Sequence, residues 1–279
     1  MKLLKGRPIA DKILADLKRR IAKSQRAPAL AAVLVGNNKA SELYVSLKQK
    51  AAGEIGMDFW VLSFSAQDSE KDVLQAIKDL NRDRDIHGII VQLPLPKKFD
   101  TQKIVNAVDP RKDVDGFHWQ NIQLFVKGKN KVVPAFPQAI LQLIESDKRE
   151  LAGKRGVGVV NSQMFGEMMV KTLQRKKIKA EYVLSSNIKY QISKLKEADI
   201  VITAIGKPGI IRGKMLKKGV VVIDGGVSKI GQRVVGDIDL KSVSKVARAI
   251  SPVPGGVGPM TIACLLQNVY LAFKKQTRG

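Results

Sequence analysis

The stretch HGIIVQLPLPKKFDTQKIVNAVDPRKDVDG, residues 87–116, decides the fold. It begins with a short apolar, β-branched run, Gly88 to Val91, of the kind that forms a buried strand. Pro94 and Pro96 end this run because proline lacks the backbone N–H that a strand ladder needs. Gln92 therefore stands at the carboxyl end of a buried strand, where open α/β sheets bind their ligands. We interpret the stretch, which closes in a polar loop, as the floor of an active site.

Strands and helices alternate on both sides of this stretch. Strands separated by helices of ordinary length pair in parallel through right-handed crossovers. Ser69 is placed to cap one of these helices at its amino end. In the first half we predict strands over residues 31–36, 58–64 and 88–91 and helices over residues 40–55, 69–80 and 101–108. In the second half we predict strands over residues 156–160, 180–184, 199–203 and 220–224, with helices from about Phe165 and Tyr190.

A Pro-bearing linker separates the two series. We predict irregular structure over residues 117–131, a linker over 133–137, a helix over 138–145 and a last helix over 259–275 that returns to brace the first lobe. The fold class is therefore α/β with two lobes, each a parallel sheet flanked by helices, the second Rossmann-like, and a cleft between them. The predicted domains are residues 1–133 with 259–279, and residues 134–258.

Bulk composition excludes several classes of protein. Of the 279 residues, 44% are apolar and 27% charged, which is typical of a globular chain rather than a disordered one. One cysteine, Cys264, excludes a disulfide framework and fits a reducing compartment, so we expect a cytoplasmic protein. With only two histidines besides, we expect no metal site. The sequence shows no signal-peptide core and no apolar run long enough for a membrane span.

The formal net charge of +24 would attract polyanions. The lysines are nevertheless spread along the chain, without an Arg-rich tail, and aromatic residues make up only 5%, too few for a base-stacking platform. We therefore do not expect a nucleic-acid partner, and polyanion binding stays an alternative function. The simplest explanation of the charge is a basic surface suited to an unusual ionic background.

Tyr44 and Lys48 lie four residues apart in a predicted helix and so share one face of it. A lysine beside an apolar wall has its pKa lowered by desolvation, which makes it a usable proton acceptor or donor. The alternative is an ordinary amphipathic helix with an exposed lysine and a packed tyrosine. Spacing alone does not separate the two.

The remaining polar candidates each have two interpretations. Asp113 and Asp115 lie two residues apart in a loop, so one could anchor a substrate while the other caps a turn. The Gly/Pro-rich residues 251–261 form either a ligand-binding loop that the backbone lets approach closely, or a simple turn. His87 and His118 have no ligand-like spacing, and we interpret both as structural.

Six strings occur together in the order and spacing of the FolD family: YVSLKQK, GIIVQLPLP, KDVDGF, GVVVIDGG, VGDIDL and PVPGGVGPMT. The chain resembles methylenetetrahydrofolate dehydrogenase/methenyltetrahydrofolate cyclohydrolase over nearly its whole length. The resemblance implies oxidation of 5,10-methylenetetrahydrofolate with NADP, hydrolysis of the product to 10-formyltetrahydrofolate, and a homodimer. It implies catalytic roles for Lys48, Gln92, Tyr44 and Asp115, substrate contacts for Tyr44, Asp115, Pro254, Gly255 and Gly256, and cofactor contacts for Asn161, Ser162, Gln163, Ser186, Gly206 and Gly226.

The second lobe departs from the family pattern. The family's G-R-S string is Val160-Asn161-Ser162 here, and asparagine cannot replace the charge or the fork of the arginine that usually meets the 2′-phosphate of NADP. Glu167 adds a negative charge nearby, and Val160 adds a Cβ where glycine eases a tight turn. The family's P-C-T-P hinge reads PAFP at residues 134–137. Three outcomes follow: modified NADP binding, a shift to NAD, or a lost dinucleotide site that leaves a cyclohydrolase or a folate-binding paralogue.

Overall fold

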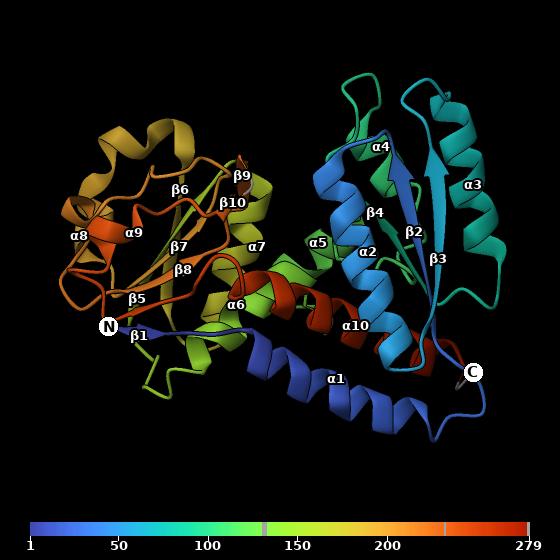
Figure 1. Cartoon of the computed structure of the whole chain (residues 1–279), viewed down its shortest axis with the longest axis horizontal. Coiled ribbons are helices and arrows are strands. Elements are labelled where there is room, and N and C mark those ends of the chain that lie inside the picture. The colour runs from blue at the N-terminus through green and yellow to red at the C-terminus, as the bar shows by residue number, and fades with distance from the viewer. Residues whose placement is uncertain (130–132, 232, 278–279) are drawn as a thin grey trace. The chain divides into compact units, whose positions relative to one another are not determined.

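The computed structural model describes residues 1–129, 133–231 and 233–277 (Figure 1). The chain divides into two compact units. One, which we call the three-stranded unit, comprises Asp11–Ala135 and Ile262–Gly279. The other, the six-stranded unit, comprises Met1–Ala10 and Phe136–Thr261.

The three-stranded unit is built on a parallel sheet in the order β3-β2-β4. The central strand β2 (Ala29–Val35) is buried at every residue because both of its edges and both of its faces are covered. An isolated parallel bridge between Ile89 and Asp113 ties the following loop to the free edge of β4. The other elements are β3 (Asp58–Phe64), β4 (Gly88–Val91), α2 (Lys39–Glu54), α3 (Glu70–Arg82), α4 (Thr101–Asn106), α5 (Trp119–Val126), most of α1 (Arg7–Ile21) and most of α10 (Val257–Gln276).

The six-stranded unit has the sheet order β1-β11-β8-β7-β5-β6, parallel throughout. Strand β5 lies between β6 and β7, so the winding reverses there, and the carboxyl ends of β5 and β7 form the switch point at which such sheets bind ligands. The strands are β1 (Lys2–Leu3), β5 (Arg155–Val160), β6 (Lys179–Leu184), β7 (Ile200–Ala204), β8 (Val221–Asp224), β11 (Ala249–Ile250) and a separate antiparallel pair, β9 (Ser228–Ile230) and β10 (Arg233–Val235). The helices are α6 (Ala135–Glu145), α7 (Gln163–Gln174), α8 (Ile192–Glu197), α9 (Leu240–Val243) and the 3-10 turns η1 (Ser185–Tyr190) and η2 (Gly213–Met215).

The predicted α/β class, with two parallel-sheet lobes, is confirmed, and every predicted strand is present to within two residues at either end. Ser69 caps α3 through a capping box with Asp72, as its position suggested. The last helix returns as predicted: in the three-stranded unit Asn268 of α10 donates to the carbonyls of Val114 and Val133. Among the described residues, no helix combines the length and the apolar character that a membrane crossing needs.

Three expectations are corrected. Residues 117–131 are not irregular, because α5 forms within them behind the N-cap His118, although residues 130 and 131 lie outside the described part. The linker over 133–137 ends early, since α6 begins at Ala135 and accommodates Pro137 in its first turn, where proline removes no helical hydrogen bond. The first ten residues belong with the six-stranded unit, because β1 pairs with β11 there.

Candidate active site

Lys48 and Gln92 meet in the three-stranded unit. Lys48 lies on α2 and is only 8% exposed, and Gln92 directly follows β4. The Lys48 Nζ donates to Gln92 Oε1 across 2.8 Å. The Gln92 backbone N–H continues the sheet ladder to the Val33 carbonyl, so the amide is carried by the rigid end of the sheet. The predicted pairing of a helix lysine with a strand-end amide is thus present.

The charge of Asp115 affects the pKa of Lys48. Burial lowers the pKa of Lys48, and the negative charge of Asp115 opposes that effect. Burial likewise raises the pKa of Asp115, with the Lys48 ammonium acting against it and Asp113 adding to it. Among the described residues, the Asp115 carboxylate has no hydrogen-bond donor. A carboxylate held near a buried lysine without its own donors is available to a ligand.

Two further contacts fix this cluster. The Gln92 side-chain amide donates from Nε2 to the Leu93 carbonyl at 2.8 Å, which leaves Oε1 to face Lys48. Helix α2 is held at its start by Asn38, whose Oδ1 accepts from the backbone N–H groups of Ala40 and Ser41. Tyr44 lies one turn before Lys48, and partial burial raises the pKa of its hydroxyl. Helix α2 therefore places Tyr44 and Lys48, four residues apart, on one face, as their spacing predicted.

Asp113 is the cap and not the anchor. Its carboxylate accepts from the backbone N–H groups of Gly116, Phe117 and His118 and from the Asn121 side chain, at 2.9–3.2 Å. Asp113 is therefore the residue that caps the turn, and the substrate-anchoring role of Asp115 stays a prediction. The described residues contain no group of three or more histidine, cysteine, aspartate or glutamate side chains arranged to hold a metal.

Both histidines are structural, as predicted. His87 Nδ1 accepts from the Ala29 N–H, and its ring contacts Phe273 edge to face at 4.8 Å. His118 caps α5 by accepting from the Gln120 N–H.

A second polar cluster occupies the switch point of the six-stranded unit. Asn161, which follows β5, donates from Nδ2 to the Ile205 carbonyl at 2.7 Å. Its Oδ1 accepts from the Ser185 hydroxyl at 2.8 Å. Asn161 thus joins the carboxyl ends of three neighbouring strands, β6, β5 and β7. Asn161, which replaces the family's arginine, therefore has a structural role, because it links the loops that follow β6 and β7.

The other residues of the expected cofactor turn lie around the start of α7. Ser162 is the N-cap and accepts from the Phe165 N–H. Gln163 donates to Glu167 along the helix at 2.9 Å, and Ser186 lies in η1. Val160 ends β5 as a buried residue without a positive φ, so its Cβ strains nothing there.

Helix α7 packs closely on β6 because of Gly166. A Cβ at this position would lie 2.5 Å from the Tyr182 ring. Close helix–strand packing is the task of the last glycine in dinucleotide-binding turns. The packing at Gly166 therefore fits a dinucleotide-binding turn. The arginine that the family carries in this turn is replaced by Asn161.

Gly206 and Gly226 lie beside a buried carboxylate, that of Asp237, which the sequence does not mark as a site residue. Asp237 is fully buried and accepts from the Thr203 hydroxyl and from the N–H groups of Ile205 and Lys207 at 2.6–2.8 Å. A Cβ at Gly226 would lie 2.1 Å from the Asp237 carboxyl carbon. The only sequence signal was the VGDIDL string, in which Asp237 occurs.

Asp224 supports the same loops. It accepts from the N–H groups of Gly226, Asp237 and Ile238, and burial raises its pKa to about 6.

Pro254, Gly255 and Gly256 belong to the six-stranded unit, whereas Tyr44, Lys48, Gln92 and Asp115 belong to the three-stranded unit. Gly255 has a φ of +100°, a conformation that favours glycine. Its carbonyl accepts from the Gly6 N–H at 2.9 Å, and a Cβ on Gly6 would lie 1.9 Å from the Gly256 oxygen. The glycines therefore serve a close backbone approach within this unit.

Comparison with known proteins places these clusters in context. Residues 4–115 match the tetrahydrofolate dehydrogenase/cyclohydrolase catalytic domain, and residues 134–277 match the NAD(P)-binding domain of the same family. The chain is 39% identical to the bifunctional protein FolD of Pelagibacter ubique over 282 residues, covering all of both chains. It is 41% identical to that of Helicobacter pylori, covering 99% of this chain and 97% of the relative.

Solved structures agree. The bifunctional FolD of Campylobacter jejuni superposes with a TM-score of 0.92 at 35% identity, covering 99% of each chain. The Trypanosoma brucei enzyme, solved with NADP and an inhibitor, superposes with a TM-score of 0.93 at 30% identity, covering 99% of this chain and 98% of that one. The chain with the Lys48–Gln92 pair in one unit and the Asn161 cluster in the other belongs to the tetrahydrofolate dehydrogenase/cyclohydrolase family.

Proposed function

We propose that the protein is a bifunctional one-carbon enzyme. It oxidises 5,10-methylenetetrahydrofolate to 5,10-methenyltetrahydrofolate and hydrolyses that product to 10-formyltetrahydrofolate. The observation that carries the proposal is the buried Lys48–Gln92 hydrogen bond in reach of the charge of Asp115. A cyclohydrolase without a dehydrogenase, and a polyanion-binding protein, are the alternatives that the experiments below exclude or establish.

Lys48 is the proton-transfer group in this proposal. In the oxidation, the one-carbon bridge loses a hydride and becomes a cationic methenyl group. In the hydrolysis, water adds to that cation and loses a proton, and one ring C–N bond then opens to leave the formyl group. A lysine whose pKa is lowered by burial takes and returns such protons more readily than an exposed lysine does. Gln92, fixed by its bond to Leu93, holds the amine in place without adding charge.

Asp115 and Tyr44 orient the substrate. Asp115 accepts hydrogen bonds from the donor-rich edge of the pterin, because charge-assisted bonds of this kind are the strongest available to an uncharged ring system. Tyr44 offers a ring face and a hydroxyl one helical turn away from the amine. Substrate contacts by Pro254, Gly255 and Gly256 are proposed on the family resemblance alone.

The six-stranded unit binds NADP, which supplies the hydride acceptor. Asn161, Ser162, Gln163, Ser186, Gly206 and Gly226 hold the dinucleotide at the switch point of the sheet. Asn161 carries no charge, and its side-chain amide is already hydrogen-bonded to Ile205 and Ser185. It therefore adds little binding energy for the 2′-phosphate of NADP. We therefore propose that NAD is also accepted. A cytoplasmic homodimer is proposed on the family resemblance alone, and sedimentation equilibrium of the purified chain tests the dimer.

Cofactor reduction is the direct test of the dehydrogenase. With methylenetetrahydrofolate, the purified protein should reduce NADP, seen as rising absorbance at roughly 340 nm, the region of the reduced nicotinamide. The arginine that usually meets the 2′-phosphate is missing. We therefore expect kcat/KM with NADP to exceed kcat/KM with NAD by no more than about tenfold, the effect of a single charge-assisted hydrogen bond to the 2′-phosphate. No absorbance change with either dinucleotide, together with intact methenyl hydrolysis, would establish the cyclohydrolase-only alternative.

Asp115→Asn tests the charge balance of the site. The Asp115 charge favours the Lys48 ammonium, so its removal should lower the pKa of Lys48 further. The hydrolysis rate rises with pH as the amine loses its proton, and its midpoint should therefore move to lower pH. The measurement is kcat for methenyl hydrolysis against pH at saturating substrate. Asp58→Asn, the same change at an exposed position, should leave the midpoint in place, and an upward shift in Asp115→Asn would refute the assignment.

A further inference from the structure

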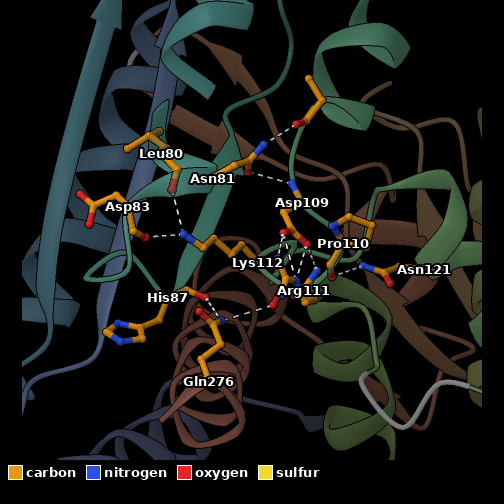
Figure 2. Close-up of polar contacts among 11 residues, drawn as sticks. Leu80, Asn81, Asp83, His87, Asp109, Pro110, Arg111, Lys112, Asn121 and Gln276 are labelled. Carbon is orange, nitrogen blue, oxygen red and sulfur yellow. Dashed lines mark hydrogen bonds and ion pairs between the residues drawn. The ribbon is translucent and has the colours of Figure 1, made fainter. Parts of the chain in front are cut away.

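The three-stranded unit contains a large cavity that the proposed function does not use. It has a volume of about 1760 Å³ and is lined by residues 23–26, 81–84, the 109–114 loop and the last turns of α10. We call it the amino-edge pocket, because residues 23–26 precede β2 and His87, which also lines it, precedes β4 (Figure 2).

The amino-edge pocket lies at the opposite edge of the sheet from the proposed folate residues. Strands of a parallel sheet start at one edge and end at the other, so His87 and Gln92 stand at opposite ends of β4. The four residues of β4 separate these ends by about 13 Å. His87 and the residues before β2 thus line the pocket at the end of β4 opposite Gln92, and its wall also includes Val114 and Gly116, the neighbours of Asp115.

The walls of this pocket are strongly basic. Among the described residues that line it, nine are lysine or arginine and three are aspartate. The basic residues are Lys23, Arg26, Arg82, Arg84, Arg111, Lys112, Lys129, Lys274 and Lys275.

The three aspartates are already occupied. Asp113 accepts from the four donors of the turn that it caps. Asp109 holds Arg111 through Nε and Nη2 at 2.6–3.1 Å, and Asp83 accepts from the Asp85 N–H. Among the described residues, none of these three carboxylates forms an ion pair with a pocket cation other than Arg111.

Most of the cations are left without a carboxylate. Arg26 pairs with Asp85. Lys112, only 6% exposed, donates to the backbone carbonyls of Leu80 and Asp83, as Figure 2 shows. Within the described part of the chain, no acidic side chain forms an ion pair with the remaining six cations: Lys23, Arg82, Arg84, Lys129, Lys274 and Lys275.

The charges of two pocket cations, Arg26 and Lys112, act on His87. Burial lowers its pKa first, and the charges of Arg26 and Lys112 lower it further, against weaker opposing effects of Asp85 and Asp83.

We propose that the amino-edge pocket binds a nucleoside polyphosphate. The unpaired cations match a chain of phosphates, and the cavity exceeds the usual size of small-ligand sites. Neutral groups complete the wall: Gln276, whose Nε2 donates to the His87 carbonyl at 2.9 Å, and Asn121 keep acceptor oxygens for a sugar or base (Figure 2).

A single-stranded nucleic acid fits less well. Such strands bind by stacking bases on exposed aromatic rings. The two phenylalanines of the lining, Phe125 and Phe273, are 0% and 4% exposed and offer no stacking platform. The absence of open rings among the described lining residues favours a small ligand.

Calorimetric titration of the full chain tests the proposal. ATP, inorganic tripolyphosphate and adenosine are titrated in turn in low salt, with saturating NADP present so that the dinucleotide site is filled. We expect ATP to bind at least about tenfold more tightly than tripolyphosphate, since the base adds contacts worth one or two hydrogen bonds, and adenosine not to bind measurably. Binding of NADP is titrated separately, so a failure of the proposed dehydrogenase is seen independently.

A matched pair of double variants locates the binding. Arg82→Ser with Lys274→Ser removes two pocket cations and should weaken ATP at least tenfold, about the worth of one charge-assisted bond. Lys18→Ser with Lys71→Ser removes two exposed cations outside the pocket lining and should change ATP affinity less than about twofold, since exposed charges are screened. Equal weakening in both, displacement of ATP by NADP, tripolyphosphate binding as tight as ATP, or a short single-stranded RNA that binds more tightly than ATP would overturn the proposal.

Discussion

Lys48→Met should lose both folate activities, by a factor of about 10²–10⁴, the usual contribution of a positioned proton-transfer group. Methionine nearly matches the length of the lysine side chain and is apolar, so it suits a position that is only 8% exposed. Gln92 Oε1 would lose its donor, but the Gln92 amide would stay bonded to Leu93. The loss should therefore appear in turnover and not in folding. The measurements are the initial rates of cofactor reduction and of methenyl hydrolysis, each at saturating substrate, beside the urea midpoint.

Lys50→Met is the matched control for this substitution. Lys50 lies on the same helix, two residues further on, and is exposed. The control makes the same chemical change and removes the same charge, so its turnover should stay within about twofold of the parent, because an exposed charge is screened. Undiminished turnover in Lys48→Met, or an equal loss in Lys50→Met, would refute the assigned role of Lys48.

The parts of the fold that the sequence predicts are those with strong local signals. Buried parallel strands need continuous apolar residues, and runs such as Gly88–Val91 and Val221–Asp224 leave little choice of structure. Gln92 is found in the same way, because prolines mark the end of its strand. Helix α5 was missed since its eight residues carry no charge pattern and its cap is a histidine, which is an unusual N-cap. Strand β1 was missed because its two residues are specified only by distant β11.

Within the candidate site, the limit is set by what each side chain contacts. Asp113 and Asp115 are the same residue type two positions apart, and only the turn at Gly116–His118, whose N–H groups converge on Asp113, distinguishes them. Asn161 reads in the sequence as a lost arginine. The strand order explains its structural role, because the Asn161 side chain can bond to Ser185 and Ile205 only when β6 and β7 flank β5.

Asp237 is a second residue whose importance arises from non-local contacts. Its carboxylate links the strand end at Thr203 to the loop that carries Gly206, and it fills the space that a side chain at Gly226 would take. Both glycines are proposed cofactor contacts. The shape of the cofactor loops therefore depends on one buried carboxylate.

Asp237→Ala should lower the free energy of unfolding by about 3–5 kcal/mol, because the buried Ile205 N–H, the buried Thr203 hydroxyl and the partly buried Lys207 N–H lose their acceptor. Urea unfolding followed by far-UV circular dichroism measures the loss. Hydrogen exchange locates it: amide exchange should rise in β7 and β8 and stay unchanged in β2 and β4. NADP affinity should fall with the loosened glycine loops.

Asp239→Ala provides the comparison. Asp239 is two residues away and partly exposed, and its carboxylate accepts only from the Ser242 hydroxyl among the described residues. Because water can replace that single bond, the free energy of unfolding should fall by no more than about 1 kcal/mol. If Asp237→Ala cost no more than Asp239→Ala, or if its exchange rose equally in β2 and β4, then Asp237 would not be the residue that shapes the loops of the six-stranded unit.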